Sequence, residues 1–558
     1  MNYKFFCFVL ATGFLALRVL AVDQSAGSAS ARVDKLFAEW KSTNSPGISV
    51  AVSQKGAVVY ERGYGMANLE LGVPITTASV FPAASISKQF TAMSVLLLVQ
   101  RGKLSLDDEV KKFFPDWAYT EQPITIRHLL THTSGLREGF TLIGISEPRE
   151  GVNVNDAIAV VLARQRGLNF APGSEFQYNN SGYNLLGTMV KRVSGQTLRQ
   201  FAEENIFKPL GMRQTHFHDD PAMLVPNRVT GYSRRGESGF QLARPEGGIV
   251  GNAGLFTTAR DLLRWEENFV NGRVGDRTLV AEMQKPLVAT DWGDGSFYGF
   301  GLATGEYRGL RMIGHGGGDP GISSYVARFP DQGVAIALLG NLDNINLMAL
   351  LRGVADIYLA NSFPASPATD SLTIPAKFSP STEQLAANVG LYHDPEIDLV
   401  GKFFVRNGKL MASADTGEEN FVELAPVGEN RFVISGTSVA IEFVPGSNSR
   451  PREARVTGVG LKPRTSRQLM PLVLSSQELR AFAGEYISPE IETTCTIGAR
   501  ESDLLLKIPG RSETVLSPVF RDAFSGLGII KFSRDAHDVV TAFTVHRADL
   551  RGLRFDRK

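Results

Sequence analysis

Residues 81–104, FPAASISKQFTAMSVLLLVQRGKL, place Ser85 and Lys88 at the start of a predicted apolar helix. Residues three apart lie on one helix face, so the Ser85 hydroxyl and the Lys88 amine can share a site. Serine is a weak nucleophile, and a lysine desolvated under an apolar helix can lose its proton and activate it. The pair therefore predicts a nucleophile beside a base. A four-residue pattern of this kind also arises by chance, at an ordinary helix start with an exposed lysine.

The sequence on both sides predicts one sheet with helices inserted between its strands. Residues 47–65 alternate in polarity around Gln54-Lys55-Gly56, which is typical of a β-hairpin. Helical patterns follow at Ile126–Leu130, Val154–Arg164, Tyr183–Val193, Leu198–Ile206 and Ala259–Phe269. Later strands are predicted at Phe297–Leu302, Arg311–Ile313, Ser324–Phe329 and Gly333–Leu339, before a closing helix over Asn346–Leu359. We expect an α/β sandwich with an antiparallel sheet.

The composition is that of ordinary globular domains. The chain has 558 residues, of which 43% are hydrophobic and 21% charged, with a net charge of +1. Two to four domains are expected, and the charge gives no reason to expect nucleic acid or an anionic membrane as partner. The oligomeric state stays open, a homodimer included.

The first residues predict export. Lys4 precedes an apolar run that ends near Val19-Leu20-Ala21, so we expect a signal peptide over residues 1–21 and a periplasmic or secreted mature chain without a membrane partner. An uncleaved anchor helix is the alternative, but the apolar run is short for a bilayer span. Removal of the signal leaves Cys495 as the single cysteine, so no internal disulfide is expected.

Three parts are predicted after the signal. The sandwich takes residues 29–361, and residues 362–382, rich in Pro, Ser and Thr, predict a linker. Residues 390–397, GLYHDPEI, match residues 484–491, GEYISPEI, so the remainder contains a repeat. Its short alternating runs predict two small antiparallel β-barrels, over residues 383–475 and 476–558.

Two further stretches carry candidate site residues. In residues 172–187, PGSEFQYNNSGYNLLG, Tyr178 and Asn180 precede a helix and could point into a cleft; alternatively Asn180 or Ser181 caps the helix and Tyr178 packs in the core. In residues 312–321, MIGHGGGDPG, His315 ends a strand pattern. The glycines after it would let a substrate lie against the strand, or would simply make a turn.

Together, Ser85/Lys88, Tyr178/Asn180 and His315/Gly317 resemble, in that order, the motifs of the penicillin-recognising serine hydrolases, specifically the class C β-lactamase-like group. The stretches IRHLLTHTSGL (126–136), FKPLGM (207–212) and GNAGLFTTARDLLRW (251–265) resemble the same group. A His-Gly-Gly third motif and two C-terminal β-domains resemble most the three-domain D-aminopeptidases within it.

The resemblance implies a role for each residue. Ser85 would be the acyl-forming nucleophile, Lys88 its activating partner and Tyr178 the proton shuttle, with coupled titrations of Lys88 and Tyr178. Asn180 would bind the substrate amide, and His315 with Gly317 would form one wall. The backbone N–H groups of Ser85 and Gly318 would form the oxyanion hole.

The third motif departs from the β-lactamase pattern Lys-Thr-Gly. His315 offers at most a half-charged imidazole where a lysine would hold a substrate carboxylate. Substrates with a free N-terminal amine, or neutral esters and amides, therefore fit better than β-lactams. The leading hypothesis is a D-aminopeptidase or amidase acting on small peptides. A carboxylesterase or weak β-lactamase is second, and a non-catalytic binder of peptide or peptidoglycan is third.

Other motifs favour other chemistries less well. No Gly-x-Ser-x-Gly turn occurs, so an α/β-hydrolase is not indicated. His132 could act as a triad base, but it lies in the family-like stretch THTSGL. His216 and His218 could bind zinc only with further ligands, and a polar surface loop is more common. No metal or cofactor is expected. The barrels could select substrates or serve as packing modules, with Ser517–Gly526 as a candidate loop that either reaches the site or is ordinary barrel structure.

Overall fold

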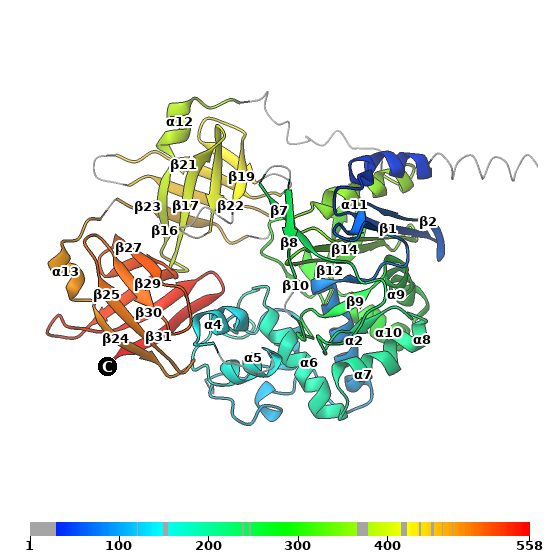
Figure 1. Cartoon of the computed structure of the whole chain (residues 1–558), viewed down its shortest axis with the longest axis horizontal. Helices are drawn as coiled ribbons and strands as arrows, with labels where there is room; N and C mark the ends of the chain where they lie inside the picture. The colour runs from blue at the N-terminus through cyan, green and yellow to red at the C-terminus, as the bar shows by residue number, and fades with distance from the viewer. Residues whose placement is uncertain are drawn as a thin grey trace, which may run out of the picture. The chain divides into compact units, whose positions relative to one another are not determined.

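The computed structural model describes most of the chain, in two compact units that are interleaved in sequence (Figure 1). The described residues are 29–119, 121–148, 154–236, 239–244, 247–364, 378–414, 421–434, 437–447, 451–459, 461–470 and 472–558. The predicted signal peptide, residues 1–21, lies outside them, as does most of the predicted linker 362–382. The first unit draws on residues 1–100, 194–285 and 300–367, and the second on residues 101–193, 286–299 and 368–558.

An antiparallel sheet forms the centre of the first unit. Its strands lie in the order β12 (Ala303–Tyr307), β13 (Leu310–Asp319), β14 (Ile322–Phe329), β15 (Val334–Gly340), β1 (Ile48–Gln54) and β2 (Ala57–Tyr64). The pairing of β1 with β15 joins the two ends of the unit, with Val50 opposite Leu338. The sheet therefore combines strands from the two ends of the unit, which are far apart in the sequence, as the hairpin and strand patterns predict.

Helices cover this sheet. The helix α11 (Leu347–Tyr358) packs on β14 and β15, and its buried Leu351 and Val354 share a core with Val50 and Ile336. The helix α9 (Ala259–Asn271) packs on β1 and β15, and the almost wholly buried α2 (Ser87–Gln100) adjoins α7 (Leu198–Ala202) and α10 (Asp276–Met283). Further elements of the unit include η1 (Ala38–Lys41), β3 (Met66–Asn68), β4 (Val73–Pro74), β5 (Phe81–Pro82), η2 (Ala84–Ile86), the π-helical turn η4 (Glu203–Phe207), α8 (Lys208–Leu210), β6 (His216–Phe217), β7 (Tyr232–Arg235), β8 (Gly239–Leu242) and β9 (Leu255–Thr257).

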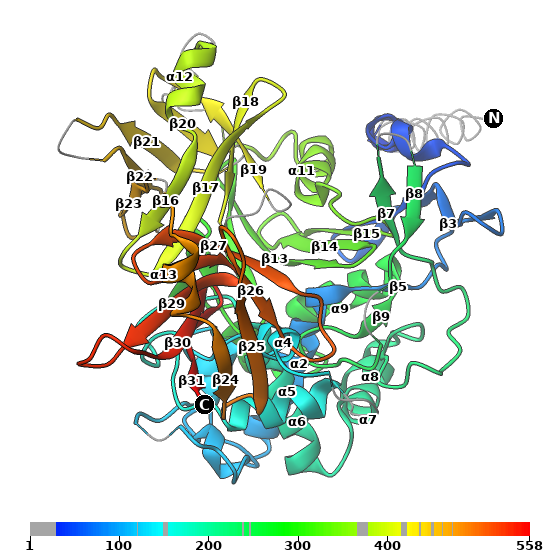
Figure 2. The ribbon, with the colours of Figure 1, turned by 60° about the vertical axis from the view of Figure 1, so that its left-hand side comes forward.

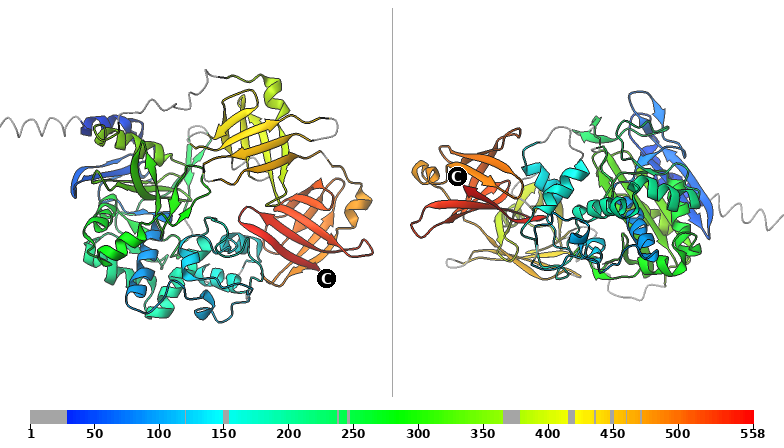
Figure 3. Two further views of the ribbon diagram at one scale, coloured as in Figure 1. Left: turned by 180° about the vertical axis from the view of Figure 1, so that it is seen from behind. Right: turned by 90° about the horizontal axis from the view of Figure 1, so that it is seen from below.

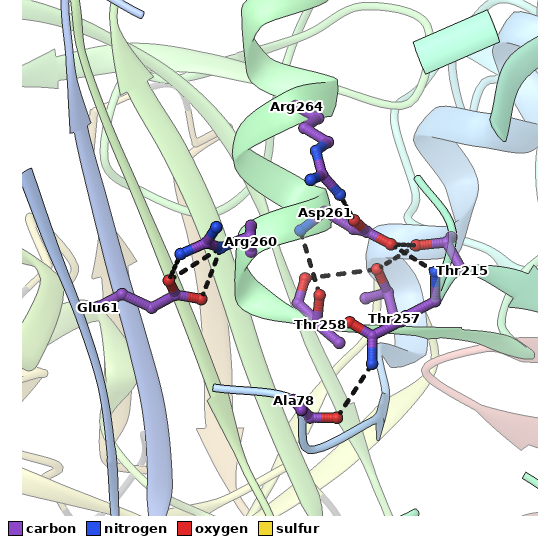
Figure 4. Close-up of polar contacts among 9 residues, drawn as sticks. Glu61, Ala78, Thr215, Thr257, Thr258, Arg260, Asp261 and Arg264 are labelled. Atoms are coloured by element: carbon purple, nitrogen blue, oxygen red, sulfur yellow. Dashed lines mark hydrogen bonds and ion pairs between the residues drawn. The ribbon is translucent and has the colours of Figure 1, made fainter. Parts of the chain in front are cut away.

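Polar contacts fix the start of α9 (Figure 4). The Thr258 hydroxyl caps the helix by accepting from the Asp261 backbone N–H at 3.2 Å, and the Asp261 carboxylate accepts from the Thr215 hydroxyl at 2.9 Å. Arg260 forms a two-point ion pair with Glu61 on β2. The stretch before α9, residues 251–257, is thereby held in place, and it carries a partner of Lys88.

One predicted strand is wrong, and another is longer than predicted. The strand expected over Phe297–Leu302 is interrupted: β11 covers Phe297–Tyr298 and β12 begins at Ala303. Between them Gly301 has a φ of 76°, and a Cβ there would lie 2.7 Å from the Lys88 carbonyl oxygen, so the chain bends against α2. The strand β13 continues through the glycines after His315 because they pair in register with β14, as Gly317 does with Ser324.

The second unit contains a helical part, a short hairpin and two closed barrels. The helical part comprises η3 (Val110–Lys112), α3 (Ile126–Leu130), α4 (Gly139–Ile145), α5 (Val154–Ala163) and most of α6 (Asn180–Ser194), and the hairpin comprises β10 (Val288–Ala289) and β11. The connection between α3 and α4, residues 131–138, contains His132, whose backbone is left-handed, with φ at 58°. This helical part carries Tyr178 and Asn180.

Each repeat closes into an eight-stranded antiparallel barrel (Figures 2 and 3). The first barrel comprises β16 (Gly390–Asp394), β17 (Leu399–Arg406), β18 (Lys409–Ser413), β19 (Val422–Pro426), β20 (Arg431–Ile434), β21 (Ala440–Val444), β22 (Glu453–Thr457) and β23 (Arg464–Gln468). The second comprises β24 (Gly484–Ser488), β25 (Thr493–Ala499), β26 (Leu504–Lys507), β27 (Thr514–Phe520), β28 (Ala523–Gly526), β29 (Gly528–Arg534), β30 (Val540–Arg547) and β31 (Leu550–Arg557). A capped short helix precedes each barrel, α12 (Thr382–Ala387) and α13 (Ser476–Arg480). The predicted fold class, a sandwich followed by two barrels, is confirmed.

The two barrels contact each other through apolar and charged residues. Val400 of the first packs against Val519 and Ile529 of the second. The candidate loop Ser517–Gly526 therefore contributes the β27–β28 hairpin to the barrel interface, and is ordinary barrel structure. Among the helices in the described ranges, each is too short or too polar to cross a lipid bilayer.

Asp398 is expected to make the barrel interface sensitive to acid. Burial alone would raise the pKa of this carboxyl, but hydrogen bonds from His393 and from Lys531 at 2.7 Å, with the charge of His546, lower the pKa to about 2. A depressed carboxyl pKa stabilises the fold above the unfolded-state pKa of about 4 and loses that effect as the pH falls towards 2. Asp398→Asn should lower the thermal midpoint near neutral pH, by the equivalent of about 2 kcal/mol, and the difference from wild type should shrink towards about pH 2. Midpoints measured across this range check it, and a constant difference would contradict it.

Candidate active site

Ser85 and Lys88 lie in direct contact in the first unit. Ser85 belongs to the turn η2 and Lys88 to the first turn of α2. The Lys88 Nζ donates to the Ser85 Oγ at 2.9 Å and to the Asn252 carbonyl at 3.0 Å, and the lysine side chain is fully buried. The structure thus brings the two predicted residues together. The Asn252 carbonyl binds the Lys88 amine as well and helps to hold it beside the Ser85 hydroxyl.

The backbone before Ser85 is held in an uncommon conformation. Ala84 has a φ of 46°, in the left-handed region that residues other than glycine seldom adopt. Its carbonyl accepts from the Ser87 hydroxyl at 2.6 Å, and that hydroxyl accepts from the Leu255 backbone N–H at 3.0 Å. The stretch 251–265, which the sequence marked only as family-like, therefore forms the support of the Ser85 turn.

The strand β13 lies against this turn. A Cβ at Gly317 would be 2.9 Å from the Ser85 backbone nitrogen and 2.6 Å from the Ala83 carbonyl oxygen, so no side chain fits at this position. At Gly318 a Cβ would meet no atom within 4 Å. A glycine at 317 is thus required for the approach of β13 to Ser85. The use of the Ser85 and Gly318 backbone N–H groups as oxyanion donors stays a prediction.

His315 is neutral in this setting. Its side chain is buried, and burial together with the positive charge of Lys88 lowers the pKa to about 3. Nδ1 lies 2.5 Å from the Gly316 carbonyl, which can only accept, so the ring proton is on Nδ1 and Nε2 is the acceptor nitrogen. The half charge that the sequence allowed is therefore absent near neutral pH.

Tyr178 and Asn180 lie in the second unit, where both side chains are half-buried. The alternative in which Asn180 or Ser181 caps the helix is wrong. Asn179 caps α6 by accepting from the Gly182 backbone N–H at 3.0 Å, and the Ser181 hydroxyl instead donates to the Arg137 carbonyl at 2.9 Å. Capping therefore does not account for Asn180.

Aromatic rings surround Tyr178. The ring centroids of His132, Trp292 and Tyr298 lie 4.4, 6.2 and 6.3 Å from that of Tyr178. His132, considered from the sequence as a triad base, is thus a neighbour of Tyr178.

A hairpin of the last barrel contacts the segment that carries Tyr178. The turn between β30 and β31 offers the Ala548 carbonyl to the Gln177 side chain at 2.6 Å and the Asp549 carbonyl to the Glu138 backbone N–H at 3.0 Å. Arg551 donates from its backbone N–H to the Asn169 side chain at 2.8 Å. The sequence analysis named Ser517–Gly526 as its candidate loop, and no local pattern marked this hairpin.

The corresponding hairpin of the first barrel contacts the loop that carries Trp292. Val459, in the β22–β23 turn, forms a bridge with Asp294 and donates from its backbone N–H to the Ser438 hydroxyl at 2.8 Å. Ser438, in the β20–β21 turn, donates from its own backbone N–H to the Gly293 carbonyl at 3.0 Å. The last hairpin of the second barrel thus holds the segment that carries Tyr178. The last hairpin of the first barrel, with Ser438 bonded to it, holds the loop that carries Trp292, whose ring lies near that of Tyr178.

His216 and His218 lie side by side without a metal-binding arrangement around them. Their ring nitrogens are 3.4 Å apart, His218 is buried, and burial lowers the pKa of His216 to about 4. Within the described part of the chain, no three His, Cys, Asp or Glu side chains are grouped as metal ligands. The pair packs on Phe256 and does not form the polar surface loop considered as its alternative.

Comparison with known proteins gives concordant matches. The family model described as Beta-lactamase matches residues 33–356. A D-aminopeptidase of Brucella anthropi is 27% identical over 526 residues, which cover 90% of this chain and 93% of that protein. A penicillin-binding protein of Bacillus subtilis is 27% identical over 431 residues, covering 72% of this chain and 90% of that protein. The solved D-amino acid amidase of Ochrobactrum anthropi SV3, in complex with L-phenylalanine amide, has a TM-score of 0.53 and 24% identity, over 60% of this chain and 99% of that one.

Proposed function

The chain belongs to the beta-lactamase family of serine hydrolases, and from this premise we propose that it releases N-terminal, D-configured residues from small peptides or amides through an acyl-enzyme on Ser85. The family match confirms the predicted resemblance. The observation that carries the proposal is the buried Lys88 amine, 2.9 Å from the Ser85 Oγ. A buried amine at hydrogen-bond distance is the arrangement that activates a serine hydroxyl.

In the proposed reaction the Ser85 Oγ attacks the carbonyl carbon of the scissile bond. In the roles that the resemblance implies for Lys88 and Tyr178, its proton would pass through their side chains to the leaving amine as the C–N bond breaks. Water next attacks the acyl ester and restores the Ser85 hydroxyl. Asn180 would hold the substrate amide, and the backbone N–H groups of Ser85 and Gly318 would stabilise the oxyanion.

His315 supports the proposed substrate class. A neutral imidazole does not attract a carboxylate, so a peptide or amide with a free N-terminal amine fits better than a substrate whose carboxylate must be bound there. A D-aminopeptidase similar over 90% of this chain supports the same class. Strong β-lactam hydrolysis is not expected, because His315 occupies the position at which the β-lactamase motif has a lysine that binds the substrate carboxylate.

A substrate panel tests the proposal. The mature chain should hydrolyse D-aminoacyl p-nitroanilides faster than the L-isomers, and N-acetylation of the same D-substrates should remove most of the activity. Nitrocefin should be a poor substrate. Turnover confined to p-nitrophenyl esters would contradict the aminopeptidase and indicate an esterase, and no turnover of any compound would favour a binding protein.

A further inference from the structure

His132 holds the backbone on both sides of Tyr178. The His132 carbonyl accepts from the Gln177 backbone N–H at 2.9 Å, and its Nδ1 accepts from the Asn179 backbone N–H at 3.1 Å. Tyr178 is the residue between these two donors. Its ring also lies on the imidazole, with a centroid distance of 4.4 Å and an angle of 41° between the planes. One side chain and its own carbonyl therefore fix Tyr178 at three points.

The imidazole itself cannot turn away. Its exposed fraction is 1%, and the rings of Tyr183 and Tyr298 pack on it at centroid distances of 5.1 and 4.6 Å. Two further bonds join the same chain segments, from the Gly173 N–H to the Thr133 carbonyl at 2.8 Å and from the Asn169 N–H to the Gly135 carbonyl at 2.7 Å. His132 thus lies at one end of a rigid joint between them.

The contacts define the form of the ring. Because Nδ1 accepts from a backbone N–H, its lone pair is in use and the ring proton is on Nε2. An imidazole fixed in this way is not arranged as a base for Ser85. The left-handed backbone, with φ at 58°, accompanies this geometry, and Asn is among the few residues other than glycine that adopt it readily.

We infer that His132 is a positioning residue for Tyr178: it sets the place of the phenol by holding the neighbouring backbone and the ring, without touching the substrate. The inference rests on the proposed function, in which Tyr178 moves the proton between Ser85 and the leaving group. Displacement of a proton-transferring group by about 1 Å can cost about 100-fold in rate, so loss of the joint should affect catalysis more than substrate binding.

Two variants separate the contacts. His132→Phe keeps an aromatic ring and removes the acceptor, whereas His132→Asn keeps an acceptor near the position of Nδ1 and tolerates the left-handed backbone. We expect His132→Phe to lower kcat on a D-aminoacyl p-nitroanilide by about 10- to 100-fold, with KM changed by less than about threefold. His132→Asn should retain more of the activity. The p-nitrophenyl ester should be affected less, because p-nitrophenolate leaves without a proton while the anilide nitrogen needs one.

A matched control and a double variant distinguish positioning from packing. His128→Phe removes a similar acceptor, since His128 Nδ1 accepts from the Thr125 backbone N–H at 3.2 Å, and should leave kcat nearly unchanged. If His132 acts through Tyr178, adding His132→Phe to Tyr178→Phe should cause little further loss. If the activity losses of His132→Phe and Tyr178→Phe add up in the double variant, the inference is overturned. It is also overturned if His132→Phe lowers activity on the anilide and the ester equally, in proportion to a fall in melting temperature. If His132→Phe does not fold, His132→Asn decides: a loss as large as that of Tyr178→Phe would contradict the acceptor role.

The wild-type assay keeps this inference apart from the proposed function. Failure of the wild-type chain to cleave D-aminoacyl anilides would contradict the substrate assignment. The double-variant cycle can then be measured on the rate of Ser85 labelling by a serine-reactive phosphonate, and it still tests whether His132 acts through Tyr178.

Discussion

Ser85→Ala is expected to lower turnover of every substrate by about 10⁴-fold or more. The reaction as proposed forms a covalent ester on the Ser85 Oγ, which accepts a hydrogen bond from the buried Lys88 Nζ at 2.9 Å. Loss of the oxygen removes the nucleophile and leaves the backbone unchanged, so kcat should fall while the melting temperature stays close to that of the wild type. Initial rates on the substrate panel, with thermal unfolding of the same samples, measure this.

Ser94→Ala is the matched control. Ser94 is buried on the same helix, and its hydroxyl donates only to the Phe90 carbonyl, at 2.8 Å, in its own helix. Removing this hydroxyl should leave kcat within about twofold of wild type, because it changes no group near Ser85. If Ser85→Ala retained activity comparable to Ser94→Ala, another residue would have to carry the chemistry.

Arg137→Ala is expected to detach the last barrel from the Tyr178 segment. The guanidinium, with an exposed fraction of 3%, donates to Glu490 at 2.8 Å and to the carbonyls of Arg551 and Gly552 at 3.0 Å each. Its removal leaves Glu490 buried without its cation, which costs about 3–5 kcal/mol. The β30–β31 hairpin would then lose its hold on Gln177. We expect a large fall in melting temperature, measured by calorimetry, and a fall in activity on peptides, measured as initial rates. Both measurements use the full chain.

Arg164→Ala provides the comparison. Arg164 and Glu492 form an ion pair between the same two parts of the second unit, but both side chains are well exposed, at 37% and 47%. An exposed pair contributes about 0–1 kcal/mol, so this variant should resemble wild type. Equal effects of the two substitutions would mean that burial of the Arg137 pair does not hold the barrel. Recovery of stability in Arg137→Met combined with Glu490→Leu would support the unpaired charge as the cause.

The parts of the site that could be predicted depend on short sequence distances. Ser85 and Lys88 are three residues apart, and a helical turn is enough to bring them together. The barrels were predictable because the repeat shows the same alternation twice. The paired strands β1 and β15 were predictable for a similar reason, since each carries the apolar pattern of a buried strand.

The supports of the site could not be predicted, because they join residues that are distant in sequence. Gln177 and Ala548 are 371 residues apart, and Lys88 and Asn252 are 164 apart. Several of these contacts use backbone carbonyls, which every residue has, so the side-chain sequence contains no signal for them. His132 lies closer to Tyr178, but only the turn geometry shows that its Nδ1 meets the Asn179 backbone. The interruption at Gly301 likewise depends on the approach to α2.

The most direct test of an acyl-enzyme on Ser85 is peptide mapping by mass spectrometry after reaction with a serine-reactive phosphonate. The proposed function predicts one phosphonyl group per chain, on Ser85, in wild type and in Ser94→Ala, and none in Ser85→Ala. An adduct on another residue, or labelling that persists in Ser85→Ala, would contradict it.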